Sequence, residues 1–523
     1  MKKKWTAILP YLVLAAALAL AIGPLALWGS HNLDADQSSE MVLASLLNRE
    51  GRLITDSWYY STELRVISPV PLYQLGLLLS GGDWHAARVI GLSLSFLLCA
   101  AAMIYMARGA GLGESAVCAA AVVLLPVSEV HKFLFSLGGF YTMYIAAGCW
   151  LVGLVLRAGR GRGQIPQLVR IALLGVLCGL SGVRMPMICG APLLIACLLE
   201  GFHLLRTSSS LGEVWQKEQT PMLLAGCLAV AAMLVGYLIN SRVLAGMMHF
   251  EQFGDRTLGE LDFAGFLTQL RYLAQYFGYK AGVQLLSLRG FVSVLVVLAV
   301  GFMAYSLVCG VARREALSPR LRVLLYTAAA ALAMGMFINV VTGEGHNEYA
   351  VGYYLMGVFM LVLAGFAHLE KMPFGMPWLR RLCMLGLCGV LFLQAALFTR
   401  NHMSTQESEY EHAAKALTEA GYEAGFATFW HGNVLTEASD GALEIWTLDS
   451  LHGPQRGAWL QETAHMDTLP EGRVFVYVGE SERYDNPPAA EAAHLIWESP
   501  VNGSCAYGYE NAQEVMALLK EEN

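Results

Sequence analysis

The sequence predicts an all-α, multi-pass membrane domain followed by a small α/β domain. Of its 523 residues, 56% are hydrophobic and only 14% are charged, whereas ordinary soluble domains contain roughly 25% charged residues. The mean hydropathy is +0.49. Apolar runs of membrane-spanning length recur through residues 1–400, and a polar segment, 401–523, follows them. These observations indicate an integral membrane protein with two domains.

The first apolar run begins after Met1-Lys2-Lys3-Lys4 and reaches Trp28. It is about 23 residues long, which exceeds the core of a signal peptide, and no small-residue cleavage site precedes Asp34. We therefore expect a retained first helix. Because lysines favour the cytoplasmic side, we expect the N-terminus in the cytoplasm.

Ten further apolar runs bring the predicted number of spans to about eleven. They lie at about 86–107, 115–130, 139–156, 168–182, 187–200, 221–239, 287–311, 321–341, 350–369 and 380–399. The connections between them alternate between Arg-rich and acidic, as the positive-inside rule requires. The two runs around Arg184 are short, and fit either a hairpin of half-length helices or one broken span.

Two segments predicted outside the membrane are too long for simple connections, 29–85 and 240–286. The first contains an amphipathic run at 41–47 and the cluster Trp58-Tyr59-Tyr60. We expect interfacial helices here, with the aromatic rings at headgroup depth. The second segment is similarly aromatic and predicts another interfacial platform.

The segment after Arg400 has the composition of a soluble domain. A helix is predicted at 404–420, ended by Gly421, and another at 511–520. Short β-type runs lie between them, at 425–430, 442–448, 473–478 and 494–497. This pattern predicts an extracytoplasmic α/β domain.

Charge and cysteine content exclude several classes of function. The net charge of −7 is spread thinly, and no basic run is long enough to indicate nucleic acid binding. Ten of the 11 cysteines, from Cys99 to Cys388, lie in apolar runs and are expected to pack as small hydrophobic residues. The sequence therefore offers no disulfide framework and no CxxC metal site.

Two carboxylates, Asp34 and Asp36, stand where the first helix leaves the membrane. A carboxylate in such a place can take the proton of an attacking hydroxyl group. Alternatively, Asp36 caps a helix that begins near Gln37, and Asp34 is simply solvated.

A phosphate leaving group would require cations in the same layer. Arg184 is the best candidate, because an ionisable residue between apolar runs is a functional hypothesis by default; the alternative is that its side chain reaches the headgroups. Glu129 and Lys132 alternatively form an i,i+3 pair. The other polar candidates on this side are His131, Lys132, Glu129, Glu348, Glu63 and Arg65.

These elements together resemble the GT-C membrane glycosyltransferases, most closely the bacterial group related to aminoarabinose transferases and protein O-mannosyltransferases. The motif Asp36-Gln37-Ser38-Ser39-Glu40 is similar to the Asp-Glu-x-x-Tyr pattern of these enzymes, and departs from it at Gln37 and Glu40. Relatives also carry an Arg-Tyr pair at the start of a late span. Here Gly352-Tyr353 takes that place, so the cation is absent or supplied elsewhere.

The resemblance implies transfer of a sugar from a polyprenyl-phosphate donor to an envelope glycan, lipid or protein, with inversion. The reaction would take place at the outer face of a bacterial plasma membrane. Asp36 matches the catalytic acid of the family, and Arg184, with Lys132 or His131, would hold the lipid phosphate. No cofactor is required, although the pattern Asp34-x-Asp36 leaves a divalent cation open.

Two other classes of function compete with this prediction. A transporter or lipid flippase would show inverted repeats and broken helices; 182–186 fits such a break, but no matching half is found elsewhere. A polysaccharide polymerase shares large external loops and does not require the C-terminal domain. In that domain, tryptophans either bind an acceptor glycan or form the core: Trp430, Trp446, Trp459 and Trp497.

Overall fold

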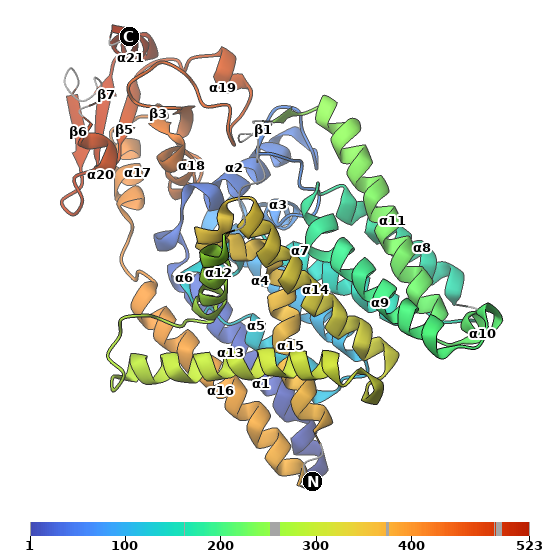
Figure 1. Ribbon diagram of the computed structural model, residues 1–523. Coiled ribbons are helices and arrows are strands. Elements are labelled where there is room, and N and C mark those ends of the chain that lie inside the picture. The colour runs from blue at the N-terminus through green and yellow to red at the C-terminus, as the bar shows by residue number, and fades with distance from the viewer. Residues whose placement is uncertain are drawn as a thin grey trace.

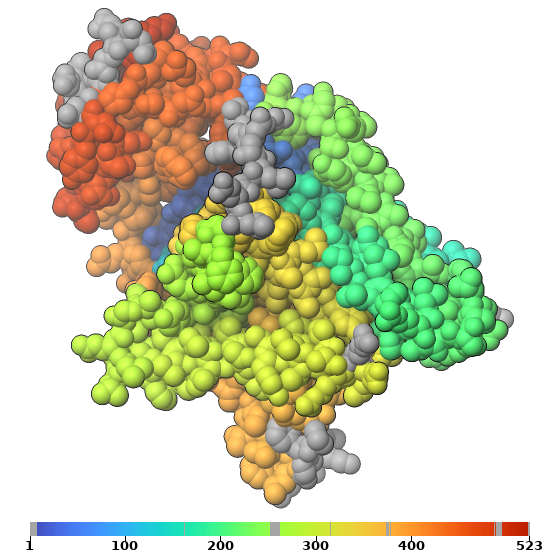
Figure 2. All heavy atoms as spheres, in the orientation of Figure 1, coloured from blue at the N-terminus to red at the C-terminus, as the bar shows by residue number. Residues whose placement is uncertain are grey.

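The computed structural model describes residues 2–161, 163–250, 262–372, 376–485, 487 and 494–521. Long helices form one body, and a small sheet domain sits at the end of this body opposite the N-terminus (Figure 1). In the space-filling view the sheet domain, in orange and red, forms a lobe of its own (Figure 2). The predicted all-α membrane domain followed by a small α/β domain is confirmed.

Eight helical segments of the described chain are long and apolar enough to cross a membrane, which makes the chain a multi-pass membrane protein. They fall in α1 (Lys2–Trp28), α4 (Trp84–Gly109), α9 (Ala191–Thr207), α11 (Thr220–Arg242), α13 (Leu288–Ala312), α14 (Pro319–Val341), α15 (Leu355–Lys371) and α16 (Pro377–His402). Shorter apolar helices are α3 (Val70–Ser80), α5 (Glu114–Val123), α7 (Thr142–Leu156) and α8 (Gln164–Gly179). Every predicted apolar run falls on one of these helices. Because three of the runs form only short helices, the number of eleven spans stays a prediction.

Segment 29–85 folds back onto the helical body. It contains η1 (Ser30–Asn32), α2 (Ala35–Glu50) and β1 (Tyr59–Tyr60), followed by α3. Strand β1 pairs in parallel with β2 (His249–Phe250). The side chain of Trp58 is fully buried inside the protein, in a cluster with Leu46, Leu64 and Leu460, whereas its depth relative to the headgroups stays a prediction.

The second predicted platform, 240–286, is described only in part, since residues 251–261 lie outside the described residues. Its helix α12 (Phe263–Tyr276) begins at Asp262, whose side chain accepts hydrogen bonds from the backbone N–H groups of Ala264 and Gly265. Such a cap satisfies N–H groups that a helix start leaves without partners.

The C-terminal domain is a five-stranded sheet in the order β4-β3-β5-β7-β6. Its strands are β3 (Ala424–Thr428), β4 (Glu444–Leu448), β5 (Val474–Val478), β6 (His494–Glu498) and β7 (Cys505–Tyr509). Its helices are α17 (Glu409–Glu419), α18 (Phe429–Ala438), α19 (Ala464–Asp467), α20 (Glu480–Arg483) and α21 (Ala512–Glu521). The four predicted strands coincide with β3 to β6, whereas β7 and α18 have no counterpart in the sequence prediction. As predicted, Gly421 follows α17, with the positive φ of 77° that glycine tolerates best.

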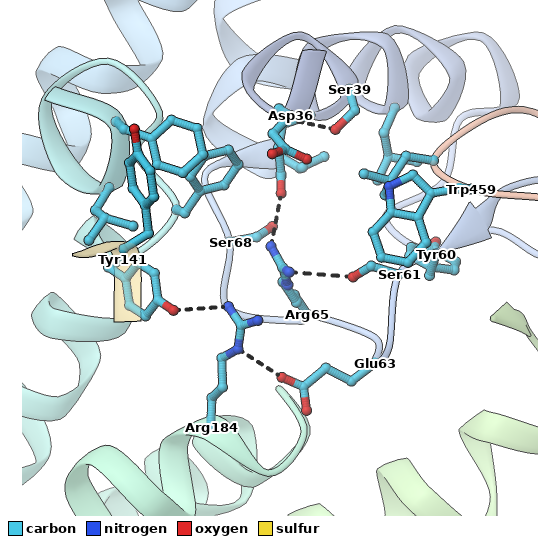
Figure 3. Close-up of a pocket in the computed structure, with 18 of the residues that line it drawn as sticks. Asp36, Ser39, Tyr60, Ser61, Glu63, Arg65, Ser68, Tyr141, Arg184 and Trp459 are labelled. Carbon is cyan, nitrogen blue, oxygen red and sulfur yellow. Dashed lines mark hydrogen bonds and ion pairs between the residues drawn. The ribbon is translucent and has the colours of Figure 1, made fainter. Parts of the chain in front are cut away.

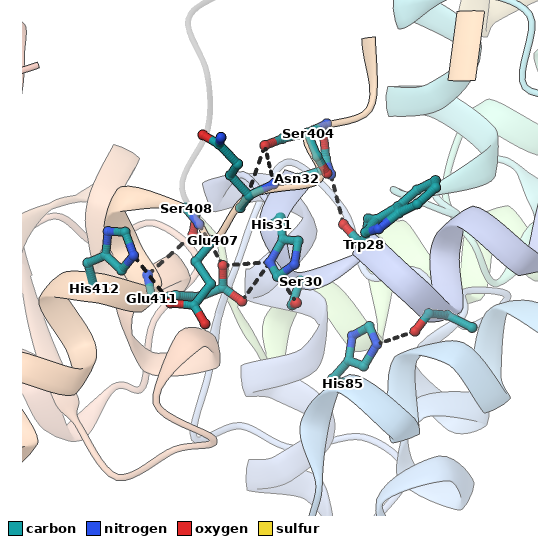
Figure 4. A network of polar contacts seen from close by, with 12 residues as sticks. Trp28, Ser30, His31, Asn32, His85, Ser404, Glu407, Ser408, Glu411 and His412 are labelled. Atoms are coloured by element: carbon teal, nitrogen blue, oxygen red, sulfur yellow. Dashed lines mark hydrogen bonds and ion pairs between the residues drawn. The ribbon is translucent and has the colours of Figure 1, made fainter. Parts of the chain in front are cut away.

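A polar network ties the C-terminal domain to the end of α1 (Figure 4). The Nδ1 atom of His31 lies 2.8 Å from Oε2 of Glu411. Glu411 also closes the capping box of α17 with Ser408. The side chain of Asn32 donates to the backbone oxygen of Ser404 at 3.1 Å and accepts from its N–H at 2.9 Å. These contacts fix the start of the domain on the helical body.

Candidate active site

One cavity of about 250 Å³ brings together Asp36, Glu63, Arg65 and Arg184, four of the candidates that the sequence predicts. Figure 3 shows their side chains around it. The wall is completed by further residues, including Ser39, Glu40, Tyr60, Ser61, Ser68, Phe133, Phe140, Tyr141, Glu344, Asn347, Tyr349, Tyr353, Trp459 and Leu460. The last two belong to the C-terminal domain, so both domains build the cavity.

The start of α2 determines where the two aspartates point. Asp34 is the N-cap, and its side chain accepts from the N–H of Gln37 at 3.0 Å. The helix therefore begins at Ala35, two residues earlier than expected, and the interpretation of Asp36 as the cap is wrong. Asp36 lies in the first turn with its carboxyl group directed into the cavity (Figure 3). Asp34 does not line the cavity.

Burial shapes the electrostatics of this turn. It raises the pKa of both Asp36 and Glu40, and the nearby Arg65 guanidinium opposes the rise. Glu40 follows Asp36 by four residues, so both carboxyl groups lie on one face of α2. The Nη1 atom of Arg65 lies 3.7 Å from Oε1 of Glu40, and Nη2 donates to Oγ of Ser61 at 3.4 Å. Within the described residues, no acceptor hydrogen-bonds to the buried Nε of Arg65.

Arg184 lies in the connection between α8 and α9, where neighbouring segments hold its guanidinium. Its Nε is 3.5 Å from Oε1 of Glu63, and its Nη1 donates to the hydroxyl of Tyr141 at 3.2 Å. The other carboxylate oxygen of Glu63 accepts from the N–H of Val183 at 2.8 Å. A side chain at Gly182 would collide with this carboxylate, and its φ of 79° also favours glycine.

The structure explains why glycine precedes Tyr353. A Cβ atom on Gly352 would lie 2.7 Å from the ring of Tyr141, closer than Cβ atoms approach other groups. The Arg184 guanidinium instead lies over Tyr141 and Tyr353, at 5.6 Å and 5.8 Å from their ring centres. A cation therefore stands beside Tyr353, but it comes from a distant part of the sequence.

The remaining candidates do not line this cavity. His131 is buried, with Nε2 3.1 Å from the backbone oxygen of Val123, and burial lowers its pKa to about 4. The ammonium group of Lys132 is 2.8 Å from Oε2 of Glu129, so these two residues form an i,i+3 pair. Glu348 opens the 3-10 helix η7 (Glu348–Tyr354) beside the cavity without reaching its wall.

Some lining residues carry no signal that sequence reasoning could use. Tyr141 and Trp459 are aromatic residues among many, and only the fold brings them to one cavity. Glu40 did carry a signal, because its four-residue spacing from Asp36 puts it on the same helix face. In the sequence motif, Glu40 stands out only as a departure from the Asp-Glu-x-x-Tyr pattern.

Within the described residues, no group of three or more His, Cys, Asp or Glu side chains is placed to hold a metal ion. Asp34 and Asp36 do not line one cavity, because Asp34 caps α2. The charges opposite Asp36 are instead the guanidinium groups of Arg65 and Arg184.

Solved structures share this architecture, although no family model matches the sequence and no curated protein matches it. ArnT from Cupriavidus metallidurans bound to undecaprenyl phosphate is 10% identical, with a TM-score of 0.57 over 97% of this chain and 98% of that chain. The same ArnT in the apo state gives 11% identity and a TM-score of 0.56, with 99% of each chain covered. The Archaeoglobus fulgidus oligosaccharyltransferase in the apo form gives 12% identity and a TM-score of 0.50, over 97% of this chain and 75% of that chain.

Proposed function

The chain has a GT-C-type fold, and from this fold and its cavity we propose that it is a membrane glycosyltransferase. It transfers a sugar from a polyprenyl-phosphate-linked donor to an envelope acceptor at the outer face of a bacterial plasma membrane. The observation that carries the proposal is the single cavity in which the Asp36 carboxyl group faces the guanidinium groups of Arg65 and Arg184. This arrangement supplies a base for an acceptor and cations for a leaving phosphate.

In the proposed reaction, Asp36 is the general base. The oxygen of an acceptor hydroxyl attacks the anomeric carbon of the donor sugar and forms the new glycosidic bond. The bond from this carbon to the phosphate oxygen breaks, its electron pair leaves with the lipid phosphate, and the hydroxyl proton passes to Asp36. Attack opposite the leaving group inverts the anomeric centre. Burial raises the pKa of Asp36, which makes its carboxylate a stronger base.

Arg65 and Arg184 are the proposed partners of the leaving phosphate. Guanidinium groups present several N–H donors in a plane that matches phosphate oxygens. The buried Nε of Arg65 has no acceptor among the described residues, so a bound phosphate oxygen would satisfy it. Lys132 and His131 are not assigned this role, because neither lines the cavity.

Donor cleavage by purified protein in liposomes tests the base. Synthetic undecaprenyl-phosphate hexoses and pentoses are supplied with a bacterial envelope extract as acceptor, and released undecaprenyl phosphate is measured by mass spectrometry. Asp36→Asn should release it roughly 10²- to 10⁴-fold more slowly, while the matched Asp34→Asn should retain most activity. Undiminished release by a folded Asp36→Asn protein contradicts the assignment of the base.

Binding of undecaprenyl phosphate tests the two arginines. Arg65→Gln and Arg184→Gln each remove one charged donor and should weaken binding by about tenfold. Lys132→Gln is the control, since this side chain pairs with Glu129 outside the cavity. Unchanged binding in both arginine variants would exclude them as phosphate ligands.

A further inference from the structure

A loop of the C-terminal domain reaches the cavity and is fixed there by both domains. The N–H of Leu460 donates to the backbone oxygen of Tyr59 at 3.0 Å, and the N–H of Tyr59 donates to the oxygen of Gln461 at 2.9 Å. Within the C-terminal domain, the side chain of Asn433 in α18 donates to the backbone oxygen of Leu460 at 3.1 Å. Leu460 has a φ of 49°, which costs energy for a residue with a branched side chain. These contacts hold Trp459 at the cavity wall.

Trp459 is the inner end of a row of three aromatic side chains, Trp459, Phe429 and Trp430, here called the aromatic platform. The ring centres of Trp459 and Phe429 are 6.3 Å apart, and those of Phe429 and Trp430 are 5.3 Å apart. Trp430 is 66% exposed and does not line the cavity. The platform therefore leads from the cavity wall to the outer surface of the C-terminal domain.

This combination of groups matches the chemistry of a carbohydrate. The C–H faces of sugar rings pack on aromatic rings, and their hydroxyl groups pair with carboxylate and amide groups. The cavity beside Trp459 offers both kinds of polar group, in Glu40, Glu344 and Asn347.

We propose that the aromatic platform binds the acceptor and that this acceptor is a glycan of more than one sugar unit. The inference rests on the proposed function and deepens it. A donor sugar is tied to its phosphate near Arg184, so a sugar that covers the exposed Trp430, outside the cavity, belongs to the acceptor. The sugar on Trp459 then presents its hydroxyl group toward Asp36.

Glycan binding without any donor tests this inference directly. Soluble hexasaccharides of glucose, galactose, mannose and arabinose are mixed with the full chain in detergent, and saturation-transfer NMR reports contact. At least one should bind, and Trp430→Ala and Trp459→Ala should each weaken its binding roughly three- to tenfold, whereas Trp459→Phe should retain most of it. Trp215→Ala, which removes another exposed tryptophan, in α10 (Leu211–Gln216), should have no effect. Absence of binding across the panel, or equal binding by all variants, overturns the inference.

Two further measurements separate the possible outcomes. With a cleavable donor and a bound glycan, Trp430→Ala should raise the KM for the glycan and leave kcat and undecaprenyl phosphate binding unchanged. The chain contains 11 tryptophans, so quenching by brominated lipids in nanodiscs is compared between the wild type and Trp430→Phe. If the wild type is quenched more than this variant, the platform contacts membrane lipid and the inference is overturned. If donor cleavage depends on Asp36 but no glycan binds, only the role of the platform is refuted. If a glycan binds but donor cleavage does not depend on Asp36, only the proposed transfer is refuted.

Discussion

Arg88 of α4 and Glu437 of α18 form a buried, bidentate ion pair, with Nε–Oε1 and Nη2–Oε2 separations of 2.7 Å and 2.6 Å. Both side chains are almost completely excluded from solvent. The Nη2 group of Arg88 also donates to the backbone oxygen of Gln37 at 3.0 Å. Because Gln37 follows Asp36, this pair connects the C-terminal domain to the turn that carries the proposed base.

Breaking the Arg88–Glu437 pair should strongly destabilise the protein. Glu437→Ala leaves a buried guanidinium without its counter-ion, which costs about 3–5 kcal/mol, and it should also slow transfer by loosening the start of α2. Removing both charges, in the double variant Arg88→Met with Glu437→Leu, should cost less than the sum of the losses in the two matching single variants, Arg88→Met and Glu437→Leu. Tryptophan fluorescence during heating measures each Tm.

The control for this cycle is Arg52→Ala, which breaks an exposed pair with Asp56 and should cost at most about 1 kcal/mol. Strictly additive losses in the Arg88 and Glu437 variants would show that the two buried charges are not coupled.

Asp34 should affect the stability of the folded state in two ways, because it caps α2 and because its carboxyl group changes protonation with pH. Burial raises its pKa to about 6, against an ordinary value of 3.8. The folded state therefore binds the proton more tightly than the unfolded state, and the stabilising contribution falls as pH rises from about 4 to 6. Asp34→Asn, which can still cap α2, should lose less stability over this interval than the wild type does. Asp34→Ala removes the cap, which costs about 1 kcal/mol, and it also removes the titrating group, so its stability should not fall over this pH interval through this position. Parallel pH dependences of Tm in the wild type and Asp34→Asn would refute the raised pKa.

Hydropathy and turn residues predicted most of the fold, because membrane helices and short strands carry their patterns locally. Each predicted apolar run became a helix, and four of the five strands of the sheet domain were found. Helix α18 was not predicted, because it begins at Phe429 directly after β3 ends at Thr428, with no turn residue between them. The burial of Trp58 has no signal in the local sequence, because its partner Leu460 lies in the other domain.

From the sequence, only those site residues could be predicted that carry an ionisable group in or beside an apolar run, where such groups are rare. Asp36 and Arg184 stood out because ionisable residues beside apolar runs are costly. His131 stood out for the same reason, yet it is buried against a backbone carbonyl. The contacts of Tyr141 and Trp459 join segments far apart in the sequence, so only tertiary packing reveals them.

Transfer activity should fall at acidic pH, because Asp36 accepts a proton only when ionised. Burial places its pKa above the usual range, so the acid limb of the rate profile should have its midpoint above about pH 4. Arg65 opposes this rise, and Arg65→Gln should move the limb to higher pH. The pH–rate profiles of the wild type and the variant, each normalised to its maximum rate, are compared by the midpoint of the acid limb. Arg184→Gln should leave the midpoint in place, and an equal displacement by both variants would contradict the pairing of Asp36 with Arg65.

Removal of divalent cations should leave transfer intact. Asp34 caps α2 and does not share the cavity with Asp36, while two guanidinium groups already provide positive charge for the phosphate. Activity in excess EDTA should match the untreated enzyme, and added Mg²⁺ or Mn²⁺ should not raise it. A loss in EDTA that Mg²⁺ reverses would show that a metal ion takes part.

Gly352→Ala should weaken donor binding without touching any charged group. The new methyl group would lie 2.7 Å from the Tyr141 ring, and the ring can yield only by moving the hydroxyl that accepts from Arg184. We expect the affinity for undecaprenyl phosphate to fall by about tenfold, as for loss of one charge-assisted contact. Tyr141→Phe removes the hydrogen bond without the collision and should cause a smaller loss. The matched control is Gly386→Ala in α16, where a methyl group meets nothing within 4 Å and should stabilise the helix by about 0.5–1 kcal/mol. Wild-type affinity in a folded Gly352→Ala protein would show that Tyr141 does not position Arg184.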